Sequence, residues 1–224
     1  MRVVESLARL ISVNKSYGEQ KVLTNVSLEI HRGDCITLYG YSGSGKSTLL
    51  NTLGLVEKVE DGVVEIEGTS VPNVFANNAM LLRRNNIRFM EQSFGLLRGQ
   101  TIAQNVLVGL AYARLSVRAK RKKVAQAIYR VGLSDMGLHT NINRLSGGQK
   151  QRVALARILV KQGDLILMDE PTSALDSENR QMVKNIIQEL IGNGNAIIIA
   201  THDAFFEEVG NRVINMADLN AARD

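Results

Sequence analysis

The chain has 224 residues, of which 45% are hydrophobic, 22% charged and 4% aromatic, and its formal net charge is +5 at pH 7. The high apolar content and low net charge exclude an intrinsically disordered chain, and a single cysteine, Cys35, excludes a disulfide scaffold. No apolar run reaches the roughly 20 residues that span a bilayer, and the opening residues lack the pattern of a secretory signal. We therefore expect any membrane role to depend on a partner.

Strands dominate the predicted elements of the first 90 residues. Apolar residues alternate over 3–13 and 22–30, which predicts two strands, and Tyr17-Gly18 forms a turn between them. Residues 35–39 are a continuous apolar run, as in a buried parallel strand, and a helix is predicted over 46–55. The remaining elements of this part are a helix near 76–84 and short strands at 63–66 and 87–90.

Helical spacing of apolar residues predominates from about residue 100 to 162, with Ser116 as a candidate N-cap and a strong helix over 149–162. Strands and helices then alternate again, which predicts an α/β fold with a mainly parallel sheet and an antiparallel part near the N-terminus. The last predicted elements are strands at 165–168 and 196–200, with a helix over 177–191 between them.

The order of these elements predicts one domain over residues 1–224. Its core would be built from about 1–92 and 161–224, and the helical block of about 93–160 would form an inserted lobe. Two prolines and the lack of any Pro/Gly-rich linker agree with a single domain.

A phosphate-binding loop is predicted between the strand at 35–39 and the helix that follows. Residues 40–47 are GYSGSGKS and match G-x-x-x-x-G-K-S. Glycines let backbone N–H groups wrap around phosphate oxygens, and the helix N-terminus adds partial positive charge. Lys46 would bridge the β and γ phosphates, and Ser47 would ligate Mg²⁺. The predicted nucleotide-binding residues here are Gly40, Tyr41, Ser42, Gly43, Ser44, Gly45, Lys46, Ser47 and Thr48.

A pair of acidic residues, Asp169 and Glu170, follows the apolar strand at 165–168. In α/β sheets, ligands bind at the carboxyl ends of the strands. Asp169 would hold Mg²⁺ through water, and Glu170 would polarise an attacking water molecule. The phosphate loop and the acidic pair together predict a P-loop NTPase with a RecA-like core.

The string LSGGQKQRVALAR at 145–157 closely resembles the signature segment of ATP-binding-cassette (ABC) ATPases, and it lies just upstream of the acidic pair as in that family. The resemblance extends from about residue 8 to 216. It implies ATP with Mg²⁺ as the ligands and an ATP-dependent homodimer, in which the signature of one subunit meets the γ-phosphate held by the other. The signature residues are Leu145, Ser146, Gly147, Gly148 and Gln149.

Other motifs of this family match single positions. Tyr17 resembles the aromatic residue that stacks on adenine, with Val22 as an apolar wall, although such a tyrosine is also common in surface turns. Gln92 resembles the Q-loop glutamine that ligates Mg²⁺, and His202 resembles the switch histidine that contacts the γ-phosphate. His31 and His139 have no motif around them, and we expect both at the surface. The D-loop at the dimer interface would be Ser173, Ala174, Leu175 and Asp176.

The segments QSFGLL at 92–97 and TIAQNV at 101–106 are similar to those of the lipoprotein-release, macrolide-export and antimicrobial-peptide group. That group usually has proline where Arg98 stands and glutamate where Gln104 stands. The resemblance implies a cytoplasmic ATPase subunit, peripheral on the membrane, that powers export or membrane release of a peptide, antibiotic or lipoprotein cargo through a permease. A regulator that signals through a membrane partner without transport, or a soluble non-transport ABC ATPase, are the alternatives.

The predicted permease contact is the stretch Gln92–Tyr112. We expect Phe94, Leu96 and Leu97 to be exposed there, the alternative being that they pack inward beneath the helical lobe. A second candidate surface is the segment Arg114–Arg130, which carries seven Lys and Arg and no acidic residue, while the rest of the chain has 20 basic and 22 acidic residues.

This concentration of charge in one segment argues against a nucleic-acid partner, which favours several basic clusters with aromatic residues between them. The simplest interpretation of the four basic residues 120–123 is a solvated helix face. Contact with anionic lipid headgroups or with an acidic permease loop is the alternative.

Overall fold

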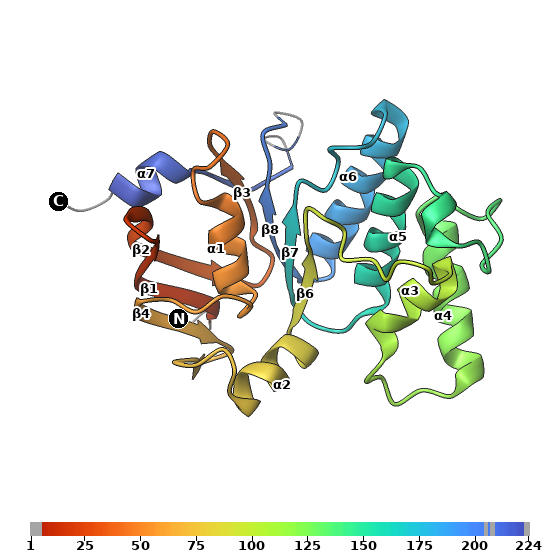
Figure 1. Cartoon of the computed structure of the whole chain (residues 1–224), viewed down its shortest axis with the longest axis horizontal. Helices are drawn as coiled ribbons and strands as arrows, with labels where there is room; N and C mark the ends of the chain where they lie inside the picture. Colours follow the sequence, from red (N-terminus) through yellow and green to blue (C-terminus); the bar gives the residue numbers. More distant parts are fainter. Residues whose placement is uncertain (1–5, 204–205, 207–208, 222–224) are drawn as a thin grey trace.

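The computed structural model describes residues 6–203, 206 and 209–221. Figure 1 shows an antiparallel sheet on one side, a parallel sheet in the centre and a group of helices on the other side. The expected strand at 3–13 therefore has its first three residues outside the described part. None of the helices in the described ranges has the length and apolar character that a membrane crossing requires.

The antiparallel sheet is built from the N-terminal third of the chain, as expected. Its strand order is β2-β1-β4-β5, and β1 pairs antiparallel with both of its neighbours. The apolar alternation along β1 and β2 buries one face of each strand, which explains why this part of the sequence has a period of two. The strands are β1 (Ser6–Tyr17), β2 (Gln20–His31), β4 (Asp61–Ile66) and β5 (Thr69–Ser70).

The second sheet has the strand order β6-β7-β8-β3-β9, and all its described pairings are parallel. The sequence predicts four of these strands but not β9. That edge strand is four residues long and only half-buried, so it lacks the apolar run that marks the central strands. The strands are β3 (Cys35–Tyr39), β6 (Ile87–Met90), β7 (Leu165–Asp169), β8 (Ala196–Ala200) and β9 (Arg212–Asn215).

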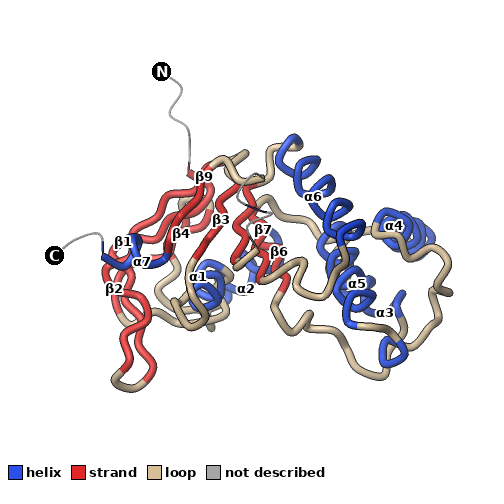
Figure 2. Tube along the Cα trace, turned by 90° about the horizontal axis from the view of Figure 1, so that it is seen from above, coloured by secondary structure: helices blue, strands red, loops and turns tan. Residues whose placement is uncertain are grey.

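The central strands are buried on both faces, which accounts for their continuous apolar sequences. Leu165 and Leu167 of β7 face the core around α1, whereas Ile166 and Met168 face the core that includes α5 and α6. Helix α1 (Lys46–Leu53) contacts strands of both sheets. Figure 2 shows α1 between the two sets of strands and α3 to α6 on the other side of the parallel sheet.

Helices form most of the segment between β6 and β7, and capping residues fix where they begin. Ser116 accepts a hydrogen bond from the Ala119 N–H at 3.2 Å and caps α4, as predicted. Thr101 and Gln104 form a reciprocal capping box on α3, in which the Thr101 hydroxyl accepts from the Gln104 N–H and the Gln104 side chain accepts from the Thr101 N–H. The helices are α2 (Asn77–Asn85), α3 (Ile102–Leu107), α4 (Val117–Arg130), α5 (Gly147–Val160), α6 (Ser177–Gly192) and α7 (Met216–Ala221), with 3₁₀ turns η1 (Val108–Leu110) and η2 (Ile142–Arg144).

One histidine differs from the sequence-based expectation. His139 is exposed as predicted, but His31 is half-buried at the end of β2. The His31 Nδ1 atom is buried and has no hydrogen-bond partner among the described residues. The pairing of β2 with β1 brings this end of the strand into the sheet, which a single polar residue beside a turn does not reveal.

Candidate active site

The phosphate loop joins β3 to α1 at the carboxyl end of the parallel sheet. Gly43 and Gly45 have positive φ angles of 83° and 96°, which glycine adopts without steric cost. A Cβ atom on Gly45 would lie 3.0 Å from the Val22 carbonyl oxygen, whereas one on Gly43 would meet nothing within 4 Å. The loop is therefore tightly packed behind Gly45 and open in front of Gly43.

Helix α1 begins at this loop without a side-chain cap. Gly45 is its N-cap residue in the left-handed conformation, and its first turn contains no acidic residue. The first backbone N–H groups of the helix therefore have no side-chain cap among the residues that the structure describes, and they are suited to an anion.

Lys46 points its charge into the same loop. Its Nζ atom donates hydrogen bonds to the carbonyl oxygens of Gly40 at 2.6 Å and Tyr41 at 3.1 Å. The ammonium group is thus held beside the open side of the loop by groups that a phosphate oxygen can replace.

Asp169 ends β7 and lies next to the start of α1. Its side chain is buried, and burial raises the pKa of this carboxyl group, an effect that a hydrogen bond with the Ser47 side chain partly offsets. The nearby charge of Glu170 raises this pKa further, and that of Lys46 lowers it. The described residues contain no group of three or more His, Cys, Asp or Glu that would hold a metal alone. One carboxylate beside one hydroxyl instead suits Mg²⁺ that arrives with phosphates and water.

Glu170 is the most constrained acidic residue of the site. Its Oε2 atom accepts a hydrogen bond from the Thr201 hydroxyl at 3.1 Å, and its Oε1 atom lies 2.8 Å from His202 Nδ1. An ionised carboxylate only accepts, so this contact requires the proton on His202 Nδ1, and Nε2 of the neutral ring is then an acceptor. Adjacent parallel strands β7 and β8 deliver the two residues, and the His202 side chain is 74% exposed.

The backbone of Glu170 has a φ of 49°, in the left-handed region that is unfavourable for a glutamate. Hydrogen bonds hold it there: the Glu170 N–H donates to the Ala200 carbonyl at 2.8 Å, and the Glu170 carbonyl accepts from Gln151 Nε2 at 2.8 Å and from the Ser173 hydroxyl at 3.2 Å. Strained residues persist only where the surrounding structure fixes them, so this one depends on its neighbours.

Gln151 is a functional candidate that the sequence did not indicate. It is fully buried on α5, and its Oε1 atom also accepts a hydrogen bond from the Ala174 N–H at 3.1 Å. One side chain thus ties the signature helix to both Glu170 and the predicted D-loop. Gln151 lies on the same buried helix face as Leu155 and Ile158. A polar residue at an otherwise apolar position of the helical pattern is the feature of the sequence that could have indicated it.

Replacement of Gln151 with leucine is expected to lower kcat for ATP hydrolysis by about 10-fold to 100-fold while the KM for ATP changes little. The variant removes the hydrogen bonds to the Ala174 N–H and to the Glu170 carbonyl, at about 0.5–1.5 kcal/mol each. The Glu170 carbonyl then keeps only its longer contacts with the Ser173 hydroxyl at 3.2 Å and the Ser173 N–H at 3.4 Å, which hold the strained backbone less firmly. Steady-state ATPase kinetics test this, with Gln126→Leu on the exposed face of α4 as the control. An unchanged kcat, or an equal loss in both variants, would contradict the positioning role.

A cavity of about 330 Å³ brings most of the predicted nucleotide-binding residues together. The Tyr17 ring, half exposed, is at its rim, and its hydroxyl donates to Glu57, while Lys15 Nζ lies 5.1 Å from the ring centroid. Gly40 and Tyr41 do not line the cavity, and Gln20 is a lining residue that was not predicted. The lining comprises Tyr17, Gln20, Val22, Ser42, Gly43, Ser44, Gly45, Lys46, Ser47, Thr48, Gln92, Asp169 and Glu170.

The signature and D-loop residues lie outside this cavity and pack on each other. Ser146 caps α5 in a reciprocal capping box with Gln149, and a Cβ atom on Gly148 would lie 2.6 Å from the Ala174 carbonyl oxygen. Asp176 caps α6 by accepting from the Asn179 N–H at 2.9 Å, a bond that lowers the pKa of its carboxyl group. The remaining members of the two segments are Leu145 and Leu175, which are buried, and Gly147 and Ser173.

The expectation that Phe94, Leu96 and Leu97 are all exposed is wrong for the first two. Phe94 and Leu96 are half-buried against the core of the helical segment, and only Leu97, at 49%, is exposed. Arg157 on α5 causes this, because its guanidinium donates to the carbonyl oxygens of Phe94 and Gly95 at 2.6 Å each and holds the loop down. The alternative interpretation of the sequence, in which these side chains pack inward beneath the helical lobe, therefore holds for Phe94 and Leu96.

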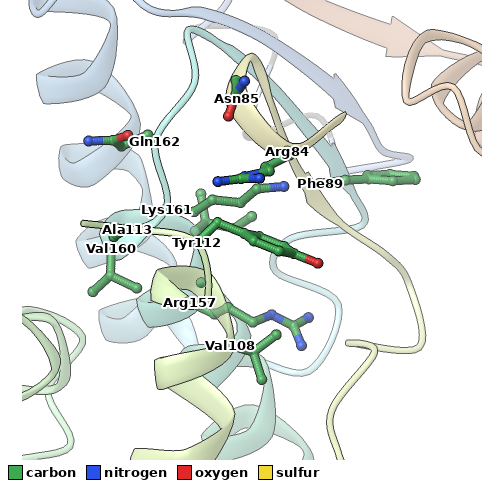
Figure 3. A pocket seen from close by; sticks show the side chains of 12 residues that line it. Arg84, Asn85, Phe89, Val108, Tyr112, Ala113, Arg157, Val160, Lys161 and Gln162 are labelled. Atoms are coloured by element: carbon green, nitrogen blue, oxygen red, sulfur yellow. The ribbon is translucent and has the colours of Figure 1, made fainter. Parts of the chain in front are cut away.

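A second cavity of about 240 Å³ lies between β6 with the end of α2 and the helices η1 and α5. Figure 3 shows the Tyr112 ring beneath Arg84, whose guanidinium carbon is 4.2 Å from the ring centroid. Lys161 also lines it, and burial together with the charges of Arg157 and Arg88 lowers the pKa of Lys161 to about 8. The cavity combines apolar walls with closely spaced cations.

Comparison with known proteins places this geometry in a family. A model of the ABC transporter family matches residues 23–173. The macrolide export ATP-binding/permease protein MacB of Salmonella typhimurium is 38% identical over 217 residues, which are 95% of this chain and 33% of that protein. The MacB of Hyphomonas neptunium is 38% identical over 216 residues, with the same two coverages, 95% and 33%. The chain thus spans about one third of the length of these relatives.

Solved structures agree with the sequence relatives. The dimeric ATP-binding cassette MJ0796, in a post-hydrolysis state bound to ADP and Pi, matches with a TM-score of 0.87 at 33% identity over 93% of both chains. A further dimeric structure of MJ0796, a bacterial ABC transporter cassette, matches with a TM-score of 0.86, also at 33% identity over 93% of both chains. These matches confirm the predicted P-loop NTPase fold, and with the family match over 23–173 they show that the chain belongs to the ABC transporter family.

Proposed function

We propose that this chain binds and hydrolyses ATP as the cassette of an ABC exporter and acts on a membrane permease from the cytoplasmic face. The observation that carries the proposal is the single cavity in which Lys46, Ser47, Asp169 and Glu170 converge. The MacB relatives are named as macrolide export proteins, which among the peptide, antibiotic and lipoprotein cargoes expected from the sequence supports an antibiotic. Hydrolysis of ATP by the purified chain is the direct test.

Each residue of the cavity has a proposed task. Tyr17 would stack on adenine against Val22, and Lys46 would exchange the Gly40 and Tyr41 carbonyls for the β and γ phosphates. Ser47, Asp169 and Gln92 would hold Mg²⁺, which supplies neutralisation of the phosphate charge. The Ser47 side chain already contacts Asp169, which is the arrangement that this role needs.

Glu170 would accept a hydrogen bond from the attacking water and orient it in line with the γ-phosphate. Its carboxylate is fixed by Thr201 and His202 at 3.1 Å and 2.8 Å, so it needs little rearrangement to do so. With a second proton on the ring, at the exposed Nε2, His202 would donate to the γ-phosphate and stabilise charge there.

The proposed working form is a homodimer with two equivalent ATP sites. Ser146–Gln149 lies outside the cavity of its own chain, so a second copy would have to bring a γ-phosphate to the start of α5, where Ser146 and Gln149 form the capping box. The D-loop, from Ser173 to Asp176, packs on α5. It would therefore move together with α5 and contact the second subunit at the interface. The dimeric form of the similar cassette MJ0796 supports this arrangement.

The helical segment of about 93–160 would act as a lobe that carries the permease contact, within one domain over 1–224. Gln92 lies in the ATP cavity, and two residues later Arg157 fixes the loop to α5. Arg157 also lines the cavity in Figure 3, which would accept a coupling segment of the permease. A shift of α5 would thus be transmitted between the γ-phosphate and the permease.

Leu97→Asp is expected to abolish co-purification with the co-expressed permease and to leave ATP binding by the isolated chain intact. The side chain is the exposed apolar residue of the loop that Arg157 holds in place, so a charge there disturbs a contact surface and not the core. Val213→Asp is the control, because Val213 is exposed to a similar extent, 53%, on the edge strand β9. Retained co-purification of the Leu97 variant would place the permease contact elsewhere.

A further inference from the structure

The segment from Gln92 to Ser134 has an unusual charge pattern. It contains 43 residues without a single Asp or Glu, and eight Lys and Arg. Seven of these basic residues fall between Arg114 and Arg130, on the loop before α4 and on α4 itself.

The basic residues form an exposed face of α4. Val124, Ala127 and Ile128 face the core, so the opposite side of the helix faces away from it. Among the residues that the structure describes, Arg130 is the one member of this set with an ion pair, to Glu189 at 2.6 Å. The exposed basic residues without such a pair are Arg114, Arg118, Arg121, Lys122 and Lys123, and Lys120 is half-buried.

Apolar side chains are exposed in the same short stretch. Tyr112 is 66% exposed, Leu115 38% and Val117 68%. Basic residues that alternate with exposed aromatic and aliphatic residues are typical of segments that lie on a membrane surface, where the apolar groups enter the headgroup region.

The position of the charges on the helix points to the same class of partner. Arg118, Lys120 and Arg121 lie in the first turns of α4, where the helix dipole disfavours positive charge and no acidic residue compensates it. An anionic surface against this end would remove that repulsion, whereas water alone screens it only partly.

We propose that Tyr112–Lys123, the basic segment, binds anionic lipid headgroups of the membrane that holds the permease. Figure 1 shows the loop before α4 and the start of α4 at the same edge of the molecule as α2. Tyr112 also stacks on Arg84 at the mouth of the cavity proposed for the permease, so the two surfaces are continuous. This placement against the membrane rests on the proposed function, but headgroup binding by the isolated chain does not.

The test measures co-sedimentation of the purified chain with vesicles of phosphatidylcholine alone or with about 30% phosphatidylglycerol. Each basic residue close to such a surface strengthens partitioning about fivefold, so Arg121→Gln, Lys122→Gln and Lys123→Gln combined are expected to weaken it about 100-fold. Lys21→Gln, Lys58→Gln and Arg144→Gln combined are the control, since they remove the same charge from exposed sites elsewhere and are expected to leave binding nearly intact.

Two further measurements exclude other partners. Val117→Ser is expected to weaken vesicle binding several-fold but not binding to a soluble polyanion such as poly(U) RNA, because only a bilayer receives the apolar side chain. Equal binding to neutral vesicles, equal loss in the control variant, or binding to poly(U) without vesicle binding would each overturn the proposal. ATP hydrolysis without vesicle binding would overturn this inference alone, and vesicle binding without ATP hydrolysis would overturn the proposed function alone.

Discussion

Glu170→Gln is expected to reduce the rate of ATP hydrolysis by about 100-fold or more while ATP binding is retained. The amide keeps the shape of the carboxylate and an oxygen that accepts from the Thr201 hydroxyl. It loses the negative charge that orients and polarises water, a contribution of roughly 10²–10⁴ for a general base. The amide NH2 group then faces His202 Nδ1, 2.8 Å away, so the imidazole would take the tautomer in which Nδ1 accepts.

The same variant tests the proposed dimer, because a site that binds ATP and cannot hydrolyse it should accumulate the closed form. Size-exclusion chromatography with and without ATP measures this, and Glu178→Gln on the exposed start of α6 is the matched control. Turnover equal to that of the unmodified chain would remove Glu170 from the proposed role. A monomer at every protein concentration with ATP would contradict the sandwich.

Local sequence patterns were sufficient for the parts of the site that are contiguous in the chain. Residues 40–48 form a loop and helix start whose geometry depends on their own glycines, and Asp169 and Glu170 end a strand that its apolar run identifies. The parallel order of β7 and β8 then brings Glu170 and His202 within hydrogen-bonding distance. This meeting follows from the fold class, because carboxyl ends of parallel strands share one edge.

Contacts between distant segments were not predictable from the sequence. Gln151 bonds to Glu170 and Ala174, and Arg157 bonds to the carbonyl of Phe94, across separations of 19, 23 and 63 residues. A glutamine or an arginine on a helix has many possible partners, and only tertiary packing selects one. For the same reason, the apolar residues of the loop 94–97 indicate that their side chains are buried against something. The sequence does not say whether α5 or a partner protein buries them.

Lys46→Ala is expected to reduce ATP hydrolysis to background and, unlike Glu170→Gln, to weaken ATP binding as well. The lysine would contact the β and γ phosphates in both the ground state and the transition state, so its loss removes binding energy from both. The bonds that Nζ makes to Gly40 and Tyr41 also hold the loop open around the phosphate position, and alanine removes them. Equilibrium binding of a fluorescent ATP analogue and single-turnover hydrolysis measure the two effects separately.

The comparison of Lys46→Ala with Lys46→Arg separates charge from geometry. Arginine keeps the charge but is a planar fork on a longer stem, and the loop is tightly packed at Gly40 and Gly45. We therefore expect partial recovery of ATP binding and little recovery of turnover. Lys58→Ala, an exposed lysine outside the cavity, controls for loss of charge alone. Full activity in Lys46→Ala, with contaminating ATPases excluded, would mean that the cavity binds nucleotide in another way. Full recovery of turnover in Lys46→Arg would mean that the site needs a positive charge there and not the shape of lysine.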